Sequence, residues 1–219
     1  MGLTQRLHFL SAILAPLNLS LKTGHLLSSL KSRAVDRSGR ALPWYTYPAV
    51  EYLSQLDFSD AEVLEFGGGQ STEWWCARAK SVVCLESNKV WSARLAQRLG
   101  GRATVLTVSS PAKAAELVGE RKFDVIVVDD GSGVGPDGRV DNARTAFSHL
   151  SPGGLVIVDN ADANYAGPIA AIAHQANWNR IDFIGFSPGS SGQSCTSLFF
   201  ADASRRLRPG AQPRIVLYG

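Results

Sequence analysis

The chain has 219 residues, of which 45% are hydrophobic and 19% charged. This length supports one good core with an extension rather than two full domains, and the composition excludes a disordered chain. We expect an N-terminal helical extension and cap over residues 1–58 and a main domain over residues 59–219.

The first 40 residues are basic although the net charge of the whole chain is only +3. They hold one acid, Asp36, and six basic residues: Arg6, Lys22, Lys31, Arg33, Arg37 and Arg40. This asymmetry can mark an anionic partner or a membrane surface, but the charges are scattered and a solvated face is the simpler interpretation.

An apolar stretch runs from Leu7 to Leu21 in this basic region. Pro16 and Asn18 interrupt it and no cleavage site follows closely, so it does not predict a secretory signal. It is also too short and too polar to span a membrane. We expect an amphipathic helix that packs on the domain or makes peripheral contact with a membrane surface.

Three cysteines indicate a reducing compartment. Cys76, Cys84 and Cys195 are odd in number and have no C-x-x-C spacing. We therefore expect reduced core thiols and a cytoplasmic protein.

A proline-bounded aromatic segment, Pro43–Pro48, precedes the main domain. Its two prolines prevent a continuous helix. Its aromatic side chains can roof a ligand pocket, or they can form a hydrophobic clasp between the extension and the sheet. Both interpretations stay open for Trp44, Tyr45 and Tyr47.

From Glu62 onward, strand and helix patterns alternate. Short apolar runs predict strands at residues 62–66, 81–86, 104–108, 123–129 and 155–159. Helical stretches lie between them at residues 71–79, 89–99, 111–118 and 141–150. Residues 180–186 and 194–201 flank a turn-rich loop and predict a hairpin. We predict an α/β fold of the Rossmann-like, doubly wound type, with a mostly parallel seven-stranded sheet and an antiparallel terminal strand.

The most informative motif is the glycine loop Gly67-Gly68-Gly69 between the first strand and its helix. Glycines there let the backbone approach a ligand closely. The loop is not the G-x-G-x-x-G fingerprint, because Thr72 stands at the third glycine and Glu65 would repel a pyrophosphate. A cationic ligand is favoured, and S-adenosylmethionine carries an ammonium and a sulfonium and no phosphate.

Later segments extend this pattern. Glu86 ends the second strand, Asp129-Asp130-Gly131 follows the fourth, and the fifth reads Gly-Gly-Leu-Val-Ile-Val-Asp-Asn over residues 153–160. With the loop, these segments resemble the motifs of class I S-adenosylmethionine-dependent methyltransferases over residues 62–201. The Pro-Trp-x-Thr-Tyr-Pro leader and the final strand at residues 196–200 are similar to those of a group of bacterial methyltransferase-like proteins.

The resemblance implies a set of cofactor contacts. Glu65 would organise the loop and reach the methionine ammonium, Glu86 would accept the ribose hydroxyls, and Ser110 would lie near the adenine amine. The simpler interpretations are a strand-end carboxylate for Glu65, a solvated carboxylate for Glu86 and a plain turn at Ser110. Ser71 departs from the family loop, which has glycine there, but it is small and can cap the helix. The predicted cofactor-binding residues are Glu65, Gly67, Gly68, Gly69, Ser71, Glu86 and Ser110.

Four polar residues follow the fourth and fifth strands and form the predicted catalytic cluster: Asp129, Asp130, Asp159 and Asn160. These strands are neighbours in the expected order, so the side chains should converge. The cluster looks like the divalent-metal triad of catechol-type O-methyltransferases, in which Mg²⁺ would lower the pKa of an acceptor hydroxyl. A turn aspartate and a helix cap explain it without metal, and we favour that interpretation.

We expect methyl transfer to the hydroxyl of a small molecule or, as the resemblance suggests, a glycan. Asp129 or Asp130 can act as base, and Arg139 and Arg144 are either acceptor contacts or surface charges. No RNA-binding module is present, so a nucleic-acid partner is not favoured. The alternatives are a non-catalytic binding or scaffold protein of the same fold and, less consistent with Glu65, a nucleotide-linked oxidoreductase.

Overall fold

The computed structural model describes residues 3–130, 138–201 and 216–217. The helices are α1 (Leu3–Thr23), α2 (His25–Lys31), α3 (Tyr47–Leu53), α4 (Gln70–Cys76), α5 (Lys89–Leu99), α6 (Pro111–Val118), α7 (Gly138–Ser148) and α8 (Ala166–Gln175). The strands are β1 (Glu62–Phe66), β2 (Ser81–Glu86), β3 (Thr104–Thr107), β4 (Phe123–Val128), β5 (Leu150–Val158), β6 (Asn179–Phe186) and β7 (Gln193–Phe200).

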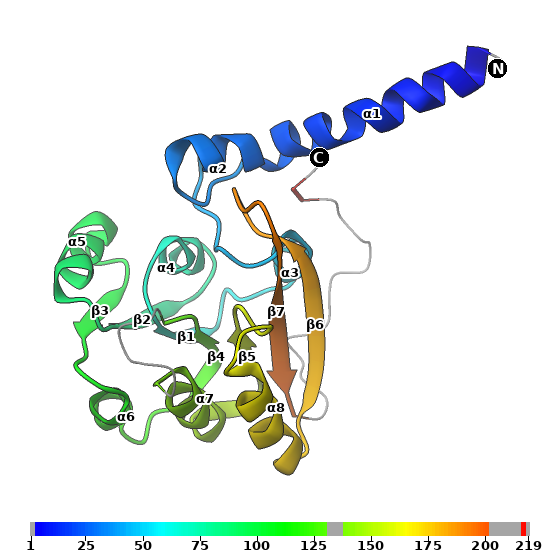
Figure 1. The fold of residues 1–219 in the computed structure, drawn as a ribbon. Coiled ribbons are helices and arrows are strands. Elements are labelled where there is room, and N and C mark those ends of the chain that lie inside the picture. The colour runs from blue at the N-terminus through cyan, green and yellow to red at the C-terminus, as the bar shows by residue number, and fades with distance from the viewer. Residues whose placement is uncertain (1–2, 131–137, 202–215, 218–219) are drawn as a thin grey trace.

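All seven strands form one sheet in the order β3-β2-β1-β4-β5-β7-β6 (Figure 1). The pairs from β3 to β5 are parallel, whereas β7 runs antiparallel to both β5 and β6. The predicted fold class is therefore confirmed. Because the chain order reverses between β1 and β4, the carboxyl ends of these two strands border the crevice where ligands bind in open α/β sheets.

The start of β5 differs from the prediction. The strand begins at Leu150 rather than Leu155, and the preceding helix ends at Ser148. Leu150 pairs with Phe123, and the register then shifts before the regular pairing of β4 with β5 resumes. Gly153 follows with a φ of 76°. The sequence pattern missed this irregular first part because it contains a proline and two glycines rather than an apolar run.

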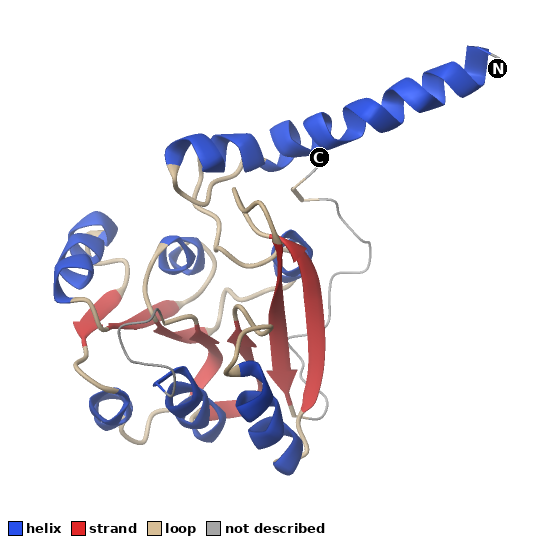
Figure 2. Ribbon diagram, in the orientation of Figure 1, coloured by secondary structure: helices blue, strands red, loops and turns tan. Residues whose placement is uncertain are grey.

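Helices cover both faces of the sheet (Figure 2). One face packs against α3, α4 and the leader segment in a cluster that includes Val50, Trp74 and Trp75. The other face packs against α6, α7 and α8 in a second cluster. Such burial on both faces explains why the central strands read as continuous apolar runs. The three cysteines are free thiols, as predicted.

The leader segment Pro43–Pro48 combines both roles left open by the sequence. Tyr45 and Tyr47 are buried in the core, and the Tyr45 hydroxyl accepts a hydrogen bond from Trp75 Nε1 at 3.3 Å. Thr46 donates from its amide to Thr196 Oγ1 and from its hydroxyl to the Phe183 carbonyl, both at 2.9 Å. Of its three aromatic side chains only Trp44 turns outward, with 39% of its surface exposed. The segment is thus a clasp with one exposed ring.

Helix α1 leads away from the rest of the domain (Figure 1). Its exposed apolar side chains include Ile13, Leu14, Leu17, Leu19 and Leu21. None of the helices in the described part of the chain is long and apolar enough to cross a membrane.

The clasp predicts a stability effect at Thr46. Replacing it by valine keeps the shape but removes the buried hydroxyl that binds the Phe183 carbonyl, so we expect a loss of about 1–3 kcal/mol in the free energy of unfolding. Thr145→Val is the control, because that hydroxyl contacts only the exposed Asp141 carbonyl of its own helix and should cost under about 0.5 kcal/mol. Urea titration measures both. Equal effects would mean that the Thr46 hydroxyl does not fasten the leader.

Candidate active site

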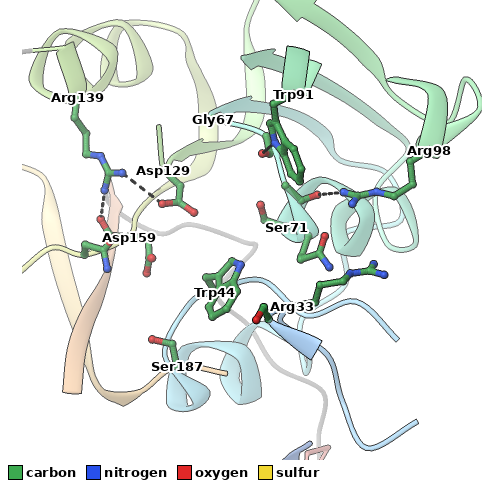
Figure 3. A pocket seen from close by; sticks show the side chains of 15 residues that line it. Arg33, Trp44, Gly67, Ser71, Trp91, Arg98, Asp129, Arg139, Asp159 and Ser187 are labelled. Carbon is green, nitrogen blue, oxygen red and sulfur yellow. Dashed lines mark hydrogen bonds and ion pairs between the residues drawn. The ribbon is translucent and has the colours of Figure 1, made fainter. Parts of the chain in front are cut away.

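A cavity of about 760 Å³ opens at the carboxyl edge of the sheet (Figure 3). Its walls come from four parts of the chain: the glycine loop, the ends of β4 and β5, helix α5, and the N-terminal segment with the loop before β7. Seven of the predicted site residues line it: Gly67, Gly68, Gly69, Ser71, Asp129, Asp159 and Asn160. The other four, Glu65, Glu86, Ser110 and Asp130, do not. Gly131, which completed the motif after the fourth strand, lies outside the described residues.

Each of the three loop positions is glycine for a different physical reason. Gly67 has a φ of +86°, and a Cβ there would lie 2.4 Å from Asp130 Cα. A Cβ on Gly68 would lie 2.5 Å from both Cys84 Sγ and Leu95 Cδ2. Gly69 has no atom within 4 Å of its Cβ position, so it faces open space. The first two glycines are needed to pack the loop, and the third leaves room in the cavity.

Glu65 organises the loop through Thr72, the residue that replaces the third glycine of a dinucleotide motif. The Gly69 amide donates to Thr72 Oγ1 at 2.9 Å, and that hydroxyl donates to Glu65 Oε2 at 2.5 Å. The other carboxylate oxygen, Glu65 Oε1, is buried and has no hydrogen-bond partner within the described ranges. Burial raises the pKa of Glu65 to about 7, although the hydroxyls of Ser71 and Thr72 oppose the shift.

Glu86 braces the same loop from the neighbouring strand. Its Oε2 accepts from the Gly68 amide at 2.9 Å and its Oε1 accepts from the Asn88 amide at 2.7 Å. The carboxylate is thereby fixed at the end of β2.

Ser110 is the N-cap of α6, and its hydroxyl accepts from the Lys113 amide at 3.2 Å.

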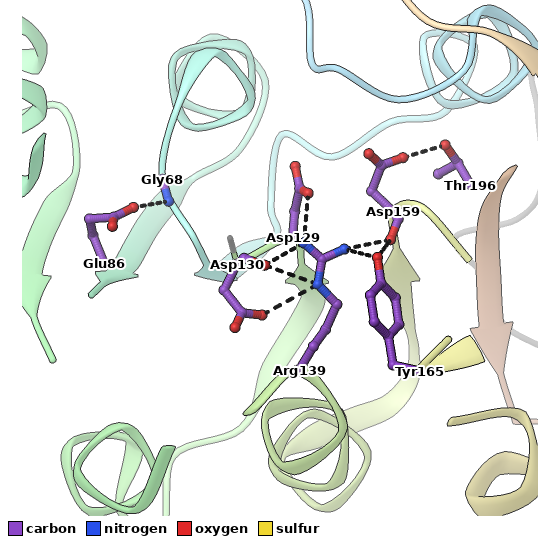
Figure 4. Close-up of polar contacts among 8 residues, drawn as sticks. All are labelled: Gly68, Glu86, Asp129, Asp130, Arg139, Asp159, Tyr165 and Thr196. Atoms are coloured by element: carbon purple, nitrogen blue, oxygen red, sulfur yellow. Dashed lines mark hydrogen bonds and ion pairs between the residues drawn. The ribbon is translucent and has the colours of Figure 1, made fainter. Parts of the chain in front are cut away.

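Arg139 ties the ends of β4 and β5 together (Figure 4). It donates from Nε to the Asp130 carbonyl at 3.0 Å and from Nη1 to the Asp159 carbonyl at 2.8 Å. Its Nη1 also reaches the Tyr165 hydroxyl, and its Nη2 lies 3.5 Å from Asp129 Oδ1. Only 9% of the side chain is exposed. Arg139 is therefore a buried clamp rather than a surface charge, and because it also lines the cavity its contact with an acceptor stays a prediction. Arg144 is exposed and pairs with Asp141.

The two carboxylates at the cavity floor resist ionisation. Burial, followed by the nearby Asp159 carboxylate, raises the pKa of Asp129 well above its usual range, and Arg139 opposes this. Burial raises the pKa of Asp159 to about 6, against the hydrogen bonds from Thr196 and the Asn160 amide. Thr196 Oγ1 donates to Asp159 Oδ1 at 2.7 Å. Carboxyl groups with raised pKa values in a cavity are candidates for acid–base work near neutral pH.

The metal triad, an aspartate after β4 with Asp159 and Asn160, stays a prediction. Within residues 3–130, 138–201 and 216–217, no three His, Cys, Asp or Glu side chains gather where they could hold a metal ion. The positive charge closest to Asp129 is the Arg139 guanidinium. One Asp159 oxygen is already engaged by Thr196.

Of the cavity mouth, the sequence raised only Trp44, as one of the aromatic residues that can roof a ligand pocket, and it did not single out the other residues. Trp91, 37% exposed, lies in the first turn of α5 and donates from Nε1 to the Gly68 carbonyl at 2.7 Å. Arg98, from the same helix, donates to the Gly69 carbonyl at 3.3 Å. Arg33 and Trp44 reach the cavity from the N-terminal segment. Asn88 as a helix cap after β2 was the available signal, because it places Trp91 at the carboxyl edge of the sheet.

No protein-family model and no curated sequence matches this chain. Solved structures match its fold. Precorrin-6y C5,15-methyltransferase from Geobacter metallireducens has a TM-score of 0.57 at 13% identity, covering 77% of this chain and 98% of that chain. A Streptococcus mutans protein in complex with SAH has a TM-score of 0.53 at 10% identity, covering 68% and 93%. A methyltransferase from Pyrococcus furiosus has a TM-score of 0.51 at 17% identity, covering 85% and 98%.

These identities are too low to carry an activity or a substrate from one protein to another, but the matches show that the fold is shared. The chain therefore has the fold of class I S-adenosylmethionine-dependent methyltransferases.

Proposed function

We propose that the protein transfers a methyl group from S-adenosylmethionine to the hydroxyl of a small molecule or glycan. One observation carries this proposal: the glycine loop and the carboxylates of Asp129 and Asp159 line the same cavity. A cofactor on the loop and an acceptor beside the carboxylates would therefore meet in one space. Alignment of two reactants in this way is a large part of the acceleration available to a methyltransferase.

The residues of the loop fit the cofactor. Glu65 Oε1 is a buried acceptor without a partner in the described part of the chain, and an ammonium group can satisfy it directly or through water. Gly69 leaves its side of the cavity open. Glu86 is held with both oxygens oriented by backbone amides, and its remaining lone pairs can accept ribose hydroxyls. The role of Ser110 near the adenine is part of the same proposal.

S-adenosylmethionine, when bound, supplies a methyl carbon already activated by the sulfonium. The chain then has to orient the acceptor and receive its proton. Asp129 lies at the cavity and its ionised carboxylate can accept that proton. Arg139 holds Asp129 and the Asp159 carbonyl in place. Asp130 does not line the cavity, so we assign it a positioning role beside Arg139.

The cavity mouth supports a hydroxylated acceptor with a flat or anionic part. Trp44 and Trp91 present partly exposed rings, on which the apolar face of a sugar can stack. Arg33 and Arg98 add net positive charge, because the two guanidinium groups share a single carboxylate, Glu73, at 4.0 and 3.7 Å. A peripheral contact of α1 with a membrane surface, through its exposed leucines, is a further part of the proposal.

Blocking the open side of the loop should abolish cofactor binding while the fold persists. We expect Gly69→Leu to lose detectable S-adenosylmethionine binding in calorimetric titration, because the new side chain projects into the cavity. Gly192→Leu is the matched control, since its Cβ position is also open but lies away from this cavity. Both variants should unfold at the wild-type temperature. Unchanged affinity in Gly69→Leu would mean that the cofactor binds elsewhere.

The raised pKa of Glu65 predicts a pH dependence of ligand affinity. The ammonium requires the ionised carboxylate, and a proton competes with it below the folded-state pKa of about 7. S-adenosylhomocysteine should therefore bind about 5- to 10-fold more weakly at pH 6 than at pH 7.5. In Glu65→Gln, affinity should be low and flat over this range. A wild-type profile that is equally flat would contradict the assigned contact.

Asp129→Asn should lower turnover by about 100- to 10,000-fold without weakening cofactor binding, because it removes only the proton acceptor. Because the pKa of Asp129 is raised, wild-type turnover should increase with pH over the range in which Asp129 loses its proton, above the usual range of an aspartate, and the variant should lack this increase. Formation of S-adenosylhomocysteine with active extract fractions measures both effects. Asp141→Asn, on the exposed face of α7, is the control. Full activity in Asp129→Asn would remove Asp129 from the mechanism.

A further inference from the structure

A second cavity, of about 490 Å³, shares no lining residue with the first. It lies between the loop before the leader segment and the C-terminal end of α4. Two acids, Asp36 and Glu73, face five basic side chains in its lining: Lys22, Arg37, Arg40, Arg78 and Arg102. The excess of positive charge in this one cavity is as large as the net charge of +3 of the whole chain.

The loop that presents Arg37 and Arg40 is tightly ordered. An antiparallel bridge between Val35 and Ala41 closes it, and Gly39 makes the turn with a φ of 80°. The Asp36 carboxylate accepts the Ser38 and Arg40 amides at 2.8 and 2.9 Å and Arg40 Nε at 2.7 Å. Asp36 is therefore committed to building the loop, and the other Arg40 nitrogens stay available to a ligand.

Arg78 is the second element of the site. Its guanidinium stacks 4.0 Å from the centroid of the Trp74 ring and donates from Nη1 to the Trp74 carbonyl at 3.2 Å. No carboxylate forms an ion pair with it in the ranges that the structure describes. Burial and the like charge of Arg40 lower the pKa of Arg78 to about 10, although Asp36 opposes this.

Glu73 does not neutralise these charges. It is shared among Arg33, Arg98 and Arg102 at 3.7 to 4.0 Å, and the first two belong to the other cavity. Trp74 lines the second cavity as well and is 1% exposed. Its Nε1 is a buried donor with no acceptor among the described residues. A cavity with surplus guanidinium groups and an unused buried donor needs an acceptor-rich anion.

We propose that this second cavity binds a phosphate-bearing ligand, with Arg78, Arg40 and Arg37 as its main contacts. Arginine forks match the tetrahedral oxygens of phosphate, and the Trp74 ring fixes the orientation of Arg78. The volume exceeds that of one phosphate group and lies in the usual range for small-molecule sites, so it can take a phosphate ester with its organic part. The phosphate can come from a free ester or from a lipid headgroup, since Lys22 belongs to the last turn of α1.

The test titrates the full chain with inorganic pyrophosphate by calorimetry at low salt. We expect saturable binding that Arg78→Gln weakens about tenfold or more, as the loss of a charge-assisted contact predicts. Arg37→Gln should also weaken it, and this variant guards against misfolding because the Arg37 side chain is exposed and forms no ion pair with the described residues. Arg144→Gln removes an equal charge from the exposed face of α7 and should leave the pyrophosphate affinity within about twofold of the wild-type value. Thermal melting checks the fold of each variant.

Sedimentation with phosphatidylglycerol vesicles, against phosphatidylcholine vesicles, distinguishes the source of the phosphate. Binding that requires both phosphatidylglycerol and Arg78 assigns a lipid headgroup, whereas Arg78-dependent binding of pyrophosphate alone assigns a free ester. The proposal is wrong if neither probe binds, if binding survives Arg78→Gln in both assays, or if Arg144→Gln weakens it equally. None of these readouts depends on methyl transfer, so the outcome is independent of the proposed function.

Discussion

The close approach of the Gly67 backbone to the end of β4 is the constraint on which the site depends. A Cβ at Gly67 would meet the Asp130 backbone at 2.4 Å, so only glycine lets the two chain segments touch here. The Gly67 amide donates to the Leu85 carbonyl at 2.8 Å, and the Asp129 amide donates to the Phe66 carbonyl at 2.9 Å. These contacts bring the glycine loop and the carboxylate of Asp129 to one edge of the sheet.

The pKa values of the carboxyl groups at this edge of the sheet are set by burial more than by pairing with opposite charges. Glu65, Asp129 and Asp159 all have raised pKa values, with burial as the largest cause. Arg139 is the one cation that contacts the floor of the cavity among the described side chains, and its donors are largely used on backbone carbonyls. The result is a set of carboxyl groups that keep their protons to a higher pH than free carboxyl groups do, with pKa values of about 7 for Glu65 and about 6 for Asp159. Such groups suit the binding of a cation at Glu65 and the acceptance of a proton at Asp129.

The sequence was sufficient for the sheet and for the strand ends that carry the site. Alternating apolar runs and the final hairpin predicted a mostly parallel sheet of seven strands with an antiparallel terminal strand, because these patterns follow from two-sided burial and from the short connection between β6 and β7. The irregular start of β5 was missed because Gly153 and Gly154 break the pattern. A pocket-roofing role for Trp44 was one of the two interpretations that the sequence left open. The buried position of Arg139 and the place of Trp91 at the cavity mouth were missed for another reason. They depend on contacts between segments distant in the chain, and no local spacing encodes such contacts.

The central claim is that the glycine loop holds S-adenosylmethionine in the cavity above Asp129. Calorimetric titration of the purified wild-type protein with S-adenosylmethionine, and separately with NADH, tests it most directly. We expect one site of micromolar affinity for S-adenosylmethionine and no heat of binding with NADH. Binding of NADH alone, or of neither ligand at millimolar concentration, would contradict it and leave the glycine loop as a structural turn.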